Sequence, residues 1–459
     1  MNIILLSGGS GKRLWPLSND IRSKQFIKIF KRPDHDIPMG TEYSAGHESM
    51  VQRIYRQIKT VDPDANVTIA TSKSQVSAIH NQLGTDVGIS VEPCRRDTFP
   101  AIALATAYLH DKMGILADEA VVVCPVDPYV DEDYFECVNR LYEEAQSGES
   151  NLVLMGIEPT YPSEKYGYIK PIYEYEMGLD NTECLNKCIV GYTFTEKPDK
   201  NTAEEYIAAG ALWNGGVFAY KLSYVLNKAQ ELLGTSDYNE LFNNYADLKK
   251  ISFDYAVVEA EKSIEVLRYT GTWKDLGTWN TLTEAMEEAS VGDVRMNDSC
   301  ENVHVINEIG VPIIVMGLKD AVVSASPEGI LVSDKEQSSY IKPFVDAIDQ
   351  QIMFAEKSWG SYRVLDVEEE SMTVKVTLNP GHGMNYHSHE KRDEVWTVIS
   401  GYGRTIIDGE ERYVVPGDIV RMPIGCKHTV IAGEKGLQLV EVQLGKDITV
   451  SDKKKFGMG

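Results

Sequence analysis

The stretch Asn2-Ile3-Ile4-Leu5-Leu6-Ser7-Gly8-Gly9-Ser10-Gly11-Lys12-Arg13 decides the fold expected for the first half of the chain. An apolar strand over Ile3–Leu6 runs directly into a glycine-rich turn. Glycines at such a turn let backbone N–H groups approach phosphate oxygens, because no Cβ stands in the way. Arg13 can then bind phosphate as a fork, and Lys24 can add a compact second positive charge. The stretch therefore predicts a phosphate-binding βα turn.

The spacing of this turn excludes two common nucleotide motifs. It lacks the Gly-Lys-Ser/Thr ending of the P-loop, and it does not fit the dinucleotide pattern G-x-G-x-x-G. Taken alone, the glycines are also compatible with a purely structural turn. The longer run Leu6–Ser18, followed by Ser23-Lys24-Gln25-Phe26, is much more specific.

Length and composition limit the class of protein. At 459 residues the chain exceeds what one hydrophobic core usually supports, so two or three domains are expected. The net charge of −24 argues against an extended nucleic-acid or membrane surface, although a local basic cluster can still hold a triphosphate. No apolar run reaches the length of about eighteen residues that a membrane span needs. The absence of a charged leader and of a cysteine framework points to the cytoplasm.

Apolar runs alternate with helical stretches up to about residue 290, which predicts a βα-type domain over 1–290. Buried strands are expected at Ile3–Leu6, Val67–Ala70, Ala120–Val123 and Leu152–Gly156. Helices are expected at Phe99–Leu109, which is apolar on all sides, and at the more polar Ala203–Ala209 and Asn280–Ala289.

The alternation of apolar runs with helical stretches ends after residue 290. Residues 291–350 predict a β-rich connecting domain with strands at Val311–Met316, Ala321–Val323 and Ile330–Val332, and a short helix at Phe344–Gln351. Residues 351–459 predict a small all-β barrel, because nearly every segment is a short strand between turn residues. Asp408-Gly409, between two strand-like runs, is a strong hairpin pattern, and Pro416-Gly417-Asp418 marks another turn.

An ordered series of motifs carries a resemblance to a known family. After the glycine turn come Glu92-Pro93 with Arg96-Asp97-Thr98, Phe194-Thr195-Glu196-Lys197-Pro198, Leu212-Trp213-Asn214-Gly215-Gly216, Phe253-Asp254-Tyr255-Ala256 and Trp273-Lys274-Asp275-Leu276-Gly277-Thr278-Trp279. Each segment alone could be structural. In this order the chain resembles the mannose-1-phosphate guanylyltransferases and their relatives among nucleotide-sugar pyrophosphorylases.

This resemblance implies a glycosyltransferase-A-like α/β fold with a Rossmann-type mixed sheet, followed by the small β domain and a cupin barrel. It also implies GTP and a sugar 1-phosphate as substrates and a homo-dimer or higher homo-oligomer. The residues implied to hold the nucleotide are Ser7, Gly8, Gly9, Gly11, Arg13, Lys24, Glu92 and Arg96. Those implied to hold the sugar phosphate are Gly167, Glu196, Lys197, Asn214 and Asp254. Arg13, Lys24 and Lys197 are implied to act in catalysis.

Asp127 and Asp275 are the candidates for binding Mg²⁺ at the transferase site. Sugar 1-phosphate attacks the α-phosphorus and pyrophosphate leaves, so negative charge has to be neutralised, and hard carboxylate oxygens suit this metal. Asp127 could instead be a turn residue before Pro128, Glu196 an ion-pair partner of Lys197, and Asn214 a turn residue.

Two departures from the family pattern bear on the sugar. The family usually has Pro-Ala-Asp-His where this chain has Pro125-Val126-Asp127-Pro128, and Gly215 replaces a serine. The same reaction on a heptose or deoxysugar phosphate, or with another base, is therefore the alternative to mannose.

The C-terminal barrel carries both cupin motifs. Gly381, His387, His389, Glu394 and Gly401 fit G-x5-H-x-H-x4-E-x6-G, and Gly417, Pro423, Gly425 and His428 fit G-x5-P-x-G-x2-H. Histidines at alternate strand positions share one face, so His387 and His389 can bind one ion. With Glu394 and His428 they predict a site for Zn²⁺ or another divalent transition metal. A metal-free remnant of the fold is the alternative.

In long members of the family this barrel is a mannose-6-phosphate isomerase of type II. Its motif Gln-x-His-His-His-Arg-x-Glu-His-Trp is altered here: Arg392, Glu394 and Trp396 are kept, and His387 replaces glutamine. Arg392 or Lys391 could hold a substrate phosphate, but the sequence identifies no base. Isomerase activity, an oxygen-dependent reaction and a sugar-sensing or oligomerisation module all stay open.

Overall fold

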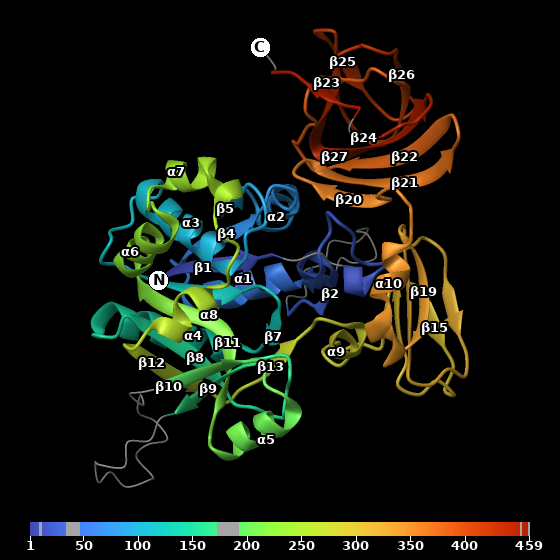
Figure 1. Cartoon of the computed structure of the whole chain (residues 1–459). Coiled ribbons are helices and arrows are strands. Elements are labelled where there is room, and N and C mark those ends of the chain that lie inside the picture. Colours follow the sequence, from blue (N-terminus) through green and yellow to red (C-terminus); the bar gives the residue numbers. More distant parts are fainter. Residues whose placement is uncertain (9–11, 34–45, 172–191, 450–451, 458–459) are drawn as a thin grey trace, which may run out of the picture. The chain divides into compact units, whose positions relative to one another are not determined.

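The computed structural model describes residues 1–8, 12–33, 46–171, 192–449 and 452–457 (Figure 1). It divides into two compact units. The first comprises Met1–Gly9, Glu48–Val76 and Thr85–Gly277, and the second comprises Ser10–His47, Ser77–Gly84 and Thr278–Gly459. The segment after the glycine turn is thus grouped with the C-terminal half. The three domains expected at 1–290, 291–350 and 351–459 stay a prediction.

The sheet of the first unit is built around the opening strand of the chain. Strand β1 (Asn2–Ser7) lies between β6 (Ala120–Pro125) and β4 (Asn66–Ser72), parallel to both, and β5 (Gly88–Glu92) is parallel to β4. Ile3, Ile4 and Leu5 are fully buried. A strand buried on both faces needs a continuous apolar run, which is what the sequence provides.

Apart from the parallel pairing of β12 (Ile264–Tyr269) with β8 (Leu152–Ile157), the other half of this sheet is antiparallel. Strand β11 (Leu212–Lys221) runs antiparallel to β6, β8 (Leu152–Ile157) and β9 (Gly167–Pro171). Strand β10 (Tyr192–Glu196) pairs with β9, and β12 (Ile264–Tyr269) pairs with β8. The predicted mixed α/β sheet is confirmed.

The helices predicted over Phe99–Leu109 and Ala203–Ala209 are present, as α3 (Thr98–Asp111) and α5 (Lys200–Ala208). Helix α3 (Thr98–Asp111) is buried on nearly all sides, as expected for the core helix. A capping box between Ser49 and Gln52 starts α1 (Met50–Val61). The other helices of this unit are α4 (Glu132–Ser147), α5 (Lys200–Ala208), α6 (Leu222–Leu233), α7 (Tyr238–Asn243), η3 (Tyr245–Asp247), α8 (Phe253–Ala256) and η4 (Val258–Ala260). Helix α2 (Val76–Leu83) belongs almost wholly to the second unit.

The helix expected over Asn280–Ala289 was wrong in length. Helix α9 spans Trp279–Thr283 and ends there. Near the end of the expected helix, the Glu288 carboxylate lies 3.5 Å from the Lys31 amine and 3.4 Å from His47 Nε2. Tertiary contacts thus override a helical pattern of ordinary strength.

The second unit begins with η1 (Lys12–Leu14), η2 (Lys24–Phe26) and β2 (Lys28–Lys31). Its β-rich part forms a sheet in the order β14 (Ser290–Val291), β16 (His304–Asn307), β18 (Ala321–Ser326) and β19 (Gly329–Asp334). Beside it β15 (Val294–Met296) pairs with β17 (Ile313–Val315). Val303, Val305, Val315, Ala321 and Val323 form the small core.

The helix expected at Phe344–Gln351 was shifted. A turn of 3-10 helix, η5 (Gln337–Tyr340), leads into α10 (Lys342–Asp346), which ends five residues earlier than expected. The proline near its first position has the backbone angle that a helix start requires, which places the start before Phe344.

The C-terminal sheet curls on itself as the predicted barrel. Its main strands are β20 (Phe354–Lys357), β21 (Gly360–Glu368), β22 (Ser371–Leu378), β23 (His387–Ser388), β24 (Asp393–Ile407), β25 (Glu410–Val414), β26 (Ile419–Met422), β27 (His428–Leu444) and β28 (Lys454–Lys455). Buried and half-buried residues alternate along β22, as a strand with one face on a core requires. Asp408 and Gly409, with φ of 46° and 90°, close the predicted hairpin between β24 and β25.

No helix among the described residues combines the length and the apolar character that crossing a membrane would need.

Candidate functional sites

Two aspartates meet beyond the carboxyl end of β6. Asp127 follows that strand directly, and β7 (Pro128–Val130) continues from it. Strand β13 (Trp273–Asp275) pairs antiparallel with β7, so Asp275 stands opposite Pro128 and thus next to Asp127. Both carboxylates are half-buried. Two hard oxygen donors this close in the fold fit a Mg²⁺ ion, although their role as ligands stays a prediction.

Four aromatic rings link the motif segments around these aspartates. The ring of Tyr166 lies 4.9 Å from that of Trp213 and 5.2 Å from that of Trp273, and Tyr161 lies 5.0 Å from Trp213. Burial raises the pKa of the Tyr166 hydroxyl, and its neighbour Tyr161 and the charge of Asp275 raise it further. The cluster holds the segments before Gly167, Asn214 and Asp275 together, and the sequence analysis did not identify it. The sequence signal that could have identified it is an aromatic residue just before each site residue: Tyr166 before Gly167, Trp213 before Asn214, and Trp273 two positions before Asp275.

Asn214 and Asp254 come together, as their shared assignment to the sugar requires. Asn214 Nδ2 donates to Asp254 Oδ1 at 2.6 Å, and Asn214 Oδ1 accepts from the Gly216 N–H at 3.0 Å. A Cβ on Gly215 would lie 3.0 Å from Cγ1 of Ile157. The glycine that replaces the family's serine therefore matches a local close approach to β8.

Gly167 on β9 lies opposite the Glu196-Lys197 segment at the end of the neighbouring strand β10. Glu196 stands opposite Gly167 in the β9–β10 register, and the Lys197 N–H donates to the Tyr166 carbonyl at 3.2 Å. Lys197 has a left-handed backbone with φ of 47°, which marks a sharp turn at this position. The side chain of Glu196 lies outside the described part of the structure.

Glu92 and Arg96 both attach to the η3 segment. Glu92 accepts from the Tyr245 hydroxyl at 2.8 Å, and Arg96 Nη2 donates to the Ala246 carbonyl. Burial raises the pKa of Glu92 above its ordinary value. The structure thus attaches both of these residues, which the family resemblance assigns to the nucleotide, to one segment, and that assignment stays a prediction.

The glycine turn is described only in part. The Ser7 hydroxyl, buried at the end of β1, donates to Gln75 Oε1 at 3.2 Å. A Cβ built on Gly8 would meet nothing within 4 Å, so the backbone there borders open space. Gly9 and Gly11 lie outside the described residues, while Arg13 and Lys24 belong to the second unit, on η1 and η2.

The second site is a buried cluster in the barrel. The ligand atoms of His387, His389, Glu394 and His428 all lie within 4.8 Å of one another. None of the four residues is more than 3% exposed. The register explains the cluster: His387 stands opposite His428 between β23 and β27, and Glu394 lies at the start of β24.

Hydrogen bonds orient all three imidazoles. Nδ1 of His387 contacts the Asn385 carbonyl at 2.6 Å, and Nδ1 of His428 contacts the Cys426 carbonyl at 3.0 Å. Nδ1 of His389 meets the Asp452 carbonyl. A carbonyl only accepts, so each Nδ1 donates to its carbonyl and leaves Nε2 as the ring nitrogen that faces the cluster.

Two of these Nε2 atoms lie within hydrogen-bond distance of one carboxylate. Glu394 lies 2.9 Å from Nε2 of His389 and 3.1 Å from Nε2 of His428. Burial lowers the pKa of His387 to about 2, with Lys453 adding to the effect. Three imidazole nitrogens and one carboxylate suit a divalent transition metal, and the cluster holds them in place.

Arg392 supports this cluster. Its Nε donates to Glu394 at 2.9 Å and its Nη1 to the Thr449 carbonyl at 3.1 Å. Lys391 is exposed and does not line the cavity beside the cluster. Arg392 is engaged in these bonds, so the phosphate contact that the sequence predicted for Arg392 or Lys391 is left to other cations of the cavity.

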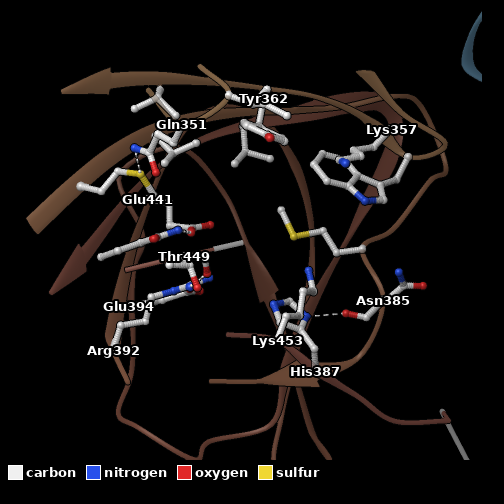
Figure 2. A pocket seen from close by; sticks show the side chains of 18 of the residues that line it. Gln351, Lys357, Tyr362, Asn385, His387, Arg392, Glu394, Glu441, Thr449 and Lys453 are labelled. Carbon is white, nitrogen blue, oxygen red and sulfur yellow. Dashed lines mark hydrogen bonds and ion pairs between the residues drawn. The ribbon is translucent and has the colours of Figure 1, made fainter. Parts of the chain in front are cut away.

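A cavity of about 430 Å³ opens beside the cluster inside the barrel (Figure 2). Three lysines line it, Lys357, Lys453 and Lys455, together with the buried Glu441. Trp396 Nε1 donates to Glu441 at 3.1 Å. Burial raises the pKa of Glu441 to about 7, with the charge of Glu394 adding to it, and burial lowers the pKa of Lys453 to about 8. Lys357 lies on β20, Glu441 on β27, and Lys453 and Lys455 near the end of the chain, all outside the two cupin motifs.

The comparisons with known proteins agree with this geometry. Residues 2–291 match the nucleotidyl transferase family model, and the chain belongs to that family. Residues 347–457 match the model described as mannose-6-phosphate isomerase C-terminal.

Relatives match over the whole length. A putative mannose-1-phosphate guanylyltransferase of Vibrio cholerae is 27% identical, with 99% of this chain and 98% of the relative covered. The xanthan biosynthesis protein XanB of Xanthomonas campestris is 28% identical, with 99% and 97% covered. A crystal structure described as mannose-1-phosphate geranyltransferase from Thermus thermophilus superposes with a TM-score of 0.60 at 26% identity, over 75% of this chain and 98% of that chain. These findings confirm the resemblance that the motif series predicted.

Proposed function

We propose that the protein transfers a guanylyl group from GTP to α-D-mannose 1-phosphate, giving GDP-mannose and pyrophosphate. The observation that carries this proposal is the adjacency of Asp127 and Asp275 where the sugar-phosphate segments of the first unit meet. Relatives named mannose-1-phosphate guanylyltransferase along nearly the whole chain support the choice of base and sugar.

The residue types match the chemistry of the transfer. A phosphate oxygen of the sugar phosphate attacks the α-phosphorus as the bond to pyrophosphate breaks, so catalysis consists mainly of positioning and charge neutralisation. A Mg²⁺ ion held by Asp127 and Asp275 would neutralise phosphate charge. Lys197 would hold the sugar phosphate, and Asn214, fixed by Asp254, would bind sugar hydroxyls. Arg13 and Lys24 would hold the triphosphate.

The experiment is a matrix of substrates. Mannose, glucose, heptose and deoxysugar 1-phosphates are each combined with GTP, ATP, CTP and UTP, and pyrophosphate release is measured. Mannose 1-phosphate with GTP should give the highest kcat/KM. A higher value for a heptose or deoxysugar pair would transfer the proposal to that sugar.

We further propose that the barrel interconverts mannose 6-phosphate and fructose 6-phosphate. A specific observation favours this second activity: a carboxylate, Glu441, lines the same cavity as the metal-binding cluster and three lysines. In the direction of fructose 6-phosphate, the proton on C2 is removed and returned to C1, and the proton of the O2 hydroxyl moves to O1, so the carbonyl moves from C1 to C2. Glu441 would carry the C–H proton, and the lysines would bind the phosphate. Zn²⁺ on the cluster would polarise the carbonyl.

The isomerase proposal is tested with the full-length protein loaded with Zn²⁺. Glu441→Gln should lower the rate of fructose 6-phosphate formation by about a hundredfold or more, within the usual range for a general base. The transferase rate serves as the internal control and should not change. Equal isomerase rates in both proteins would remove Glu441 from the mechanism, and no conversion by either would remove the activity.

We also propose that the chain works in the cytoplasm as a homo-dimer or higher homo-oligomer. Light scattering of the purified protein, at several concentrations, measures the mass of the assembly. A monomer throughout would contradict the oligomer.

A further inference from the structure

The second unit contains another cavity, of about 440 Å³, with residues different from those of the barrel interior. Strands β21 and β22 form one wall. Side chains alternate across a strand, so Val374 and Val376 face the barrel core, whereas Lys375 and Thr377 face this second cavity. The other walls come from the segment around Arg22 and Lys28 and from residues 307–310.

Two cations stand directly opposite each other on this wall. Arg363 of β21 pairs in register with Lys375 of β22, and both are half-buried. Like charges directly opposite in an antiparallel pair destabilise a sheet, so their presence calls for a compensating negative charge. The next pair on the same face is Ser361 with Thr377, and Asn379 follows. Hydroxyl and amide groups therefore continue the row of cations.

The carboxylates of this cavity already have partners. Glu308 accepts hydrogen bonds from both terminal nitrogens of Arg22, at 2.7 and 2.9 Å. Glu356 accepts a hydrogen bond from Lys28 at 2.8 Å. Among the residues that the structure describes, no carboxylate forms an ion pair with Arg363 or Lys375. The Arg22 side chain is 6% exposed, and its Nε has no hydrogen-bond partner. Arg363 Nη2 donates to the Glu308 carbonyl, which is a neutral acceptor, so positive charge exceeds negative charge on the walls of this cavity.

We propose that this cavity binds a phosphorylated sugar, with the phosphate on Arg363 and Lys375 and the sugar hydroxyls on Thr377 and Asn379. In a protein of net charge −24, four cationic side chains against two anionic ones form a local positive field that attracts an anion. The volume lies within the roughly 300–1,000 Å³ usual for small-molecule sites. Amides and hydroxyls are the groups that recognise sugar oxygens.

The position of this cavity connects it to the transferase chemistry. Arg22 and Lys28, which line it, flank Lys24, the lysine assigned to the triphosphate. Asn19 Oδ1 accepts from the Arg22 N–H at 2.7 Å, and its amide donates to Glu328 at 2.8 Å, so this segment is held firmly in the second unit. Binding of a sugar phosphate here should therefore change the KM for the nucleotide. The site itself does not depend on the proposed transferase activity.

The experiment counts binding sites by equilibrium dialysis of the full-length protein with radiolabelled mannose 6-phosphate and, separately, mannose 1-phosphate. The test variant combines Arg363→Gln and Lys375→Gln. Lys435→Gln is the matched control, because it removes one charge from an exposed position of β27 in the same barrel. Unlabelled inorganic phosphate and unlabelled mannose are added as competitors.

Wild type and the control should bind one more equivalent of at least one sugar phosphate than the double variant does. In the double variant the affinity of that site should fall at least tenfold. The same number of equivalents and the same affinity in all three proteins would overturn the proposal. Competition by inorganic phosphate as strong as by the sugar phosphate would overturn the sugar part, and competition by mannose alone would overturn the phosphate part.

A loss of binding has to be separated from a loss of folding. Lys375→Gln removes one of two opposed like charges, so its melting temperature should equal or exceed that of wild type. Thr377→Val is the second variant and keeps both charges. It should weaken the binding of the sugar phosphate but not the binding of inorganic phosphate. Unchanged sugar-phosphate binding in Thr377→Val would contradict the hydroxyl contact. Transferase turnover measured without added mannose 6-phosphate should be unchanged in both variants.

Discussion

The barrel cluster and the aspartate site of the first unit are assembled in opposite ways. In the barrel, His387, His389 and Glu394 lie within one short stretch, and one strand pairing adds His428. The aspartate site joins Asp127 to Asp275 through a pairing of β7 with β13, two strands far apart in the chain. A metal-binding site built from local motifs can be recognised by spacing, whereas one built from distant strands depends on the register of the whole sheet.

The largest effect should come from the transferase carboxylates and cations. Asp275→Ala and, separately, Lys24→Ala should lower the rate of pyrophosphate release by about a hundredfold or more, since each removes a charge that would neutralise phosphate. Melting temperature should change little, and isomerase activity should stay as in wild type. Near-normal transfer rates in both variants would refute the assigned roles.

Removal of a barrel ligand should separate the two sites. His428→Ala should lower the affinity for Zn²⁺ by about a hundredfold or more, because it leaves three ligands of four. Metal content is measured by mass spectrometry after dialysis, and transferase turnover should remain within about twofold. Full metal content in this variant would show that the cluster is not the binding site.

Gly215→Ser tests a departure from the family pattern. The new Cβ would lie 3.0 Å from Cγ1 of Ile157, so we expect a loss of about 1 kcal/mol in the free energy of unfolding. Ile157→Ala, which removes Cγ1, should abolish most of the additional loss caused by the serine in a double-mutant cycle, which denaturant unfolding measures. A serine that costs nothing would mean that this glycine reflects substrate choice rather than packing.

The smallest effect concerns a histidine outside both sites. His304 lacks the carbonyl contact that each barrel imidazole has, since its buried Nδ1 has no partner, and burial lowers its pKa to about 4. In the unfolded chain His304 has its usual pKa of about 6.5 and binds a proton below that pH, whereas in the folded protein it stays unprotonated until about pH 4. The free energy of unfolding therefore falls as the pH drops from 6.5 towards 4. His304→Gln should flatten that part of the curve of unfolding free energy against pH. A curve of the same slope would contradict the assignment.

Much of the fold could be predicted from local pattern. The buried strand β1, the core helix α3 and the hairpin at Asp408-Gly409 all follow from residue types over a few positions. The early end of helix α9 could not, because tertiary context decides where a helix ends when its local pattern is of ordinary strength. The same reason explains why the lysines and Glu441 of the barrel cavity were missed.

The sequence by itself determined the strand and glycine turn at the start of the chain, the order of the family's motifs and the four barrel residues that can bind one metal ion. Alternation along a strand and the glycine backbone are local properties, so residue types alone specify them. The tertiary structure decided that Asp275 lies beside Asp127, that aromatic rings join the motif segments, and that Arg363 faces Lys375. Each of these depends on the register between separate strands, which is set by packing of the whole sheet.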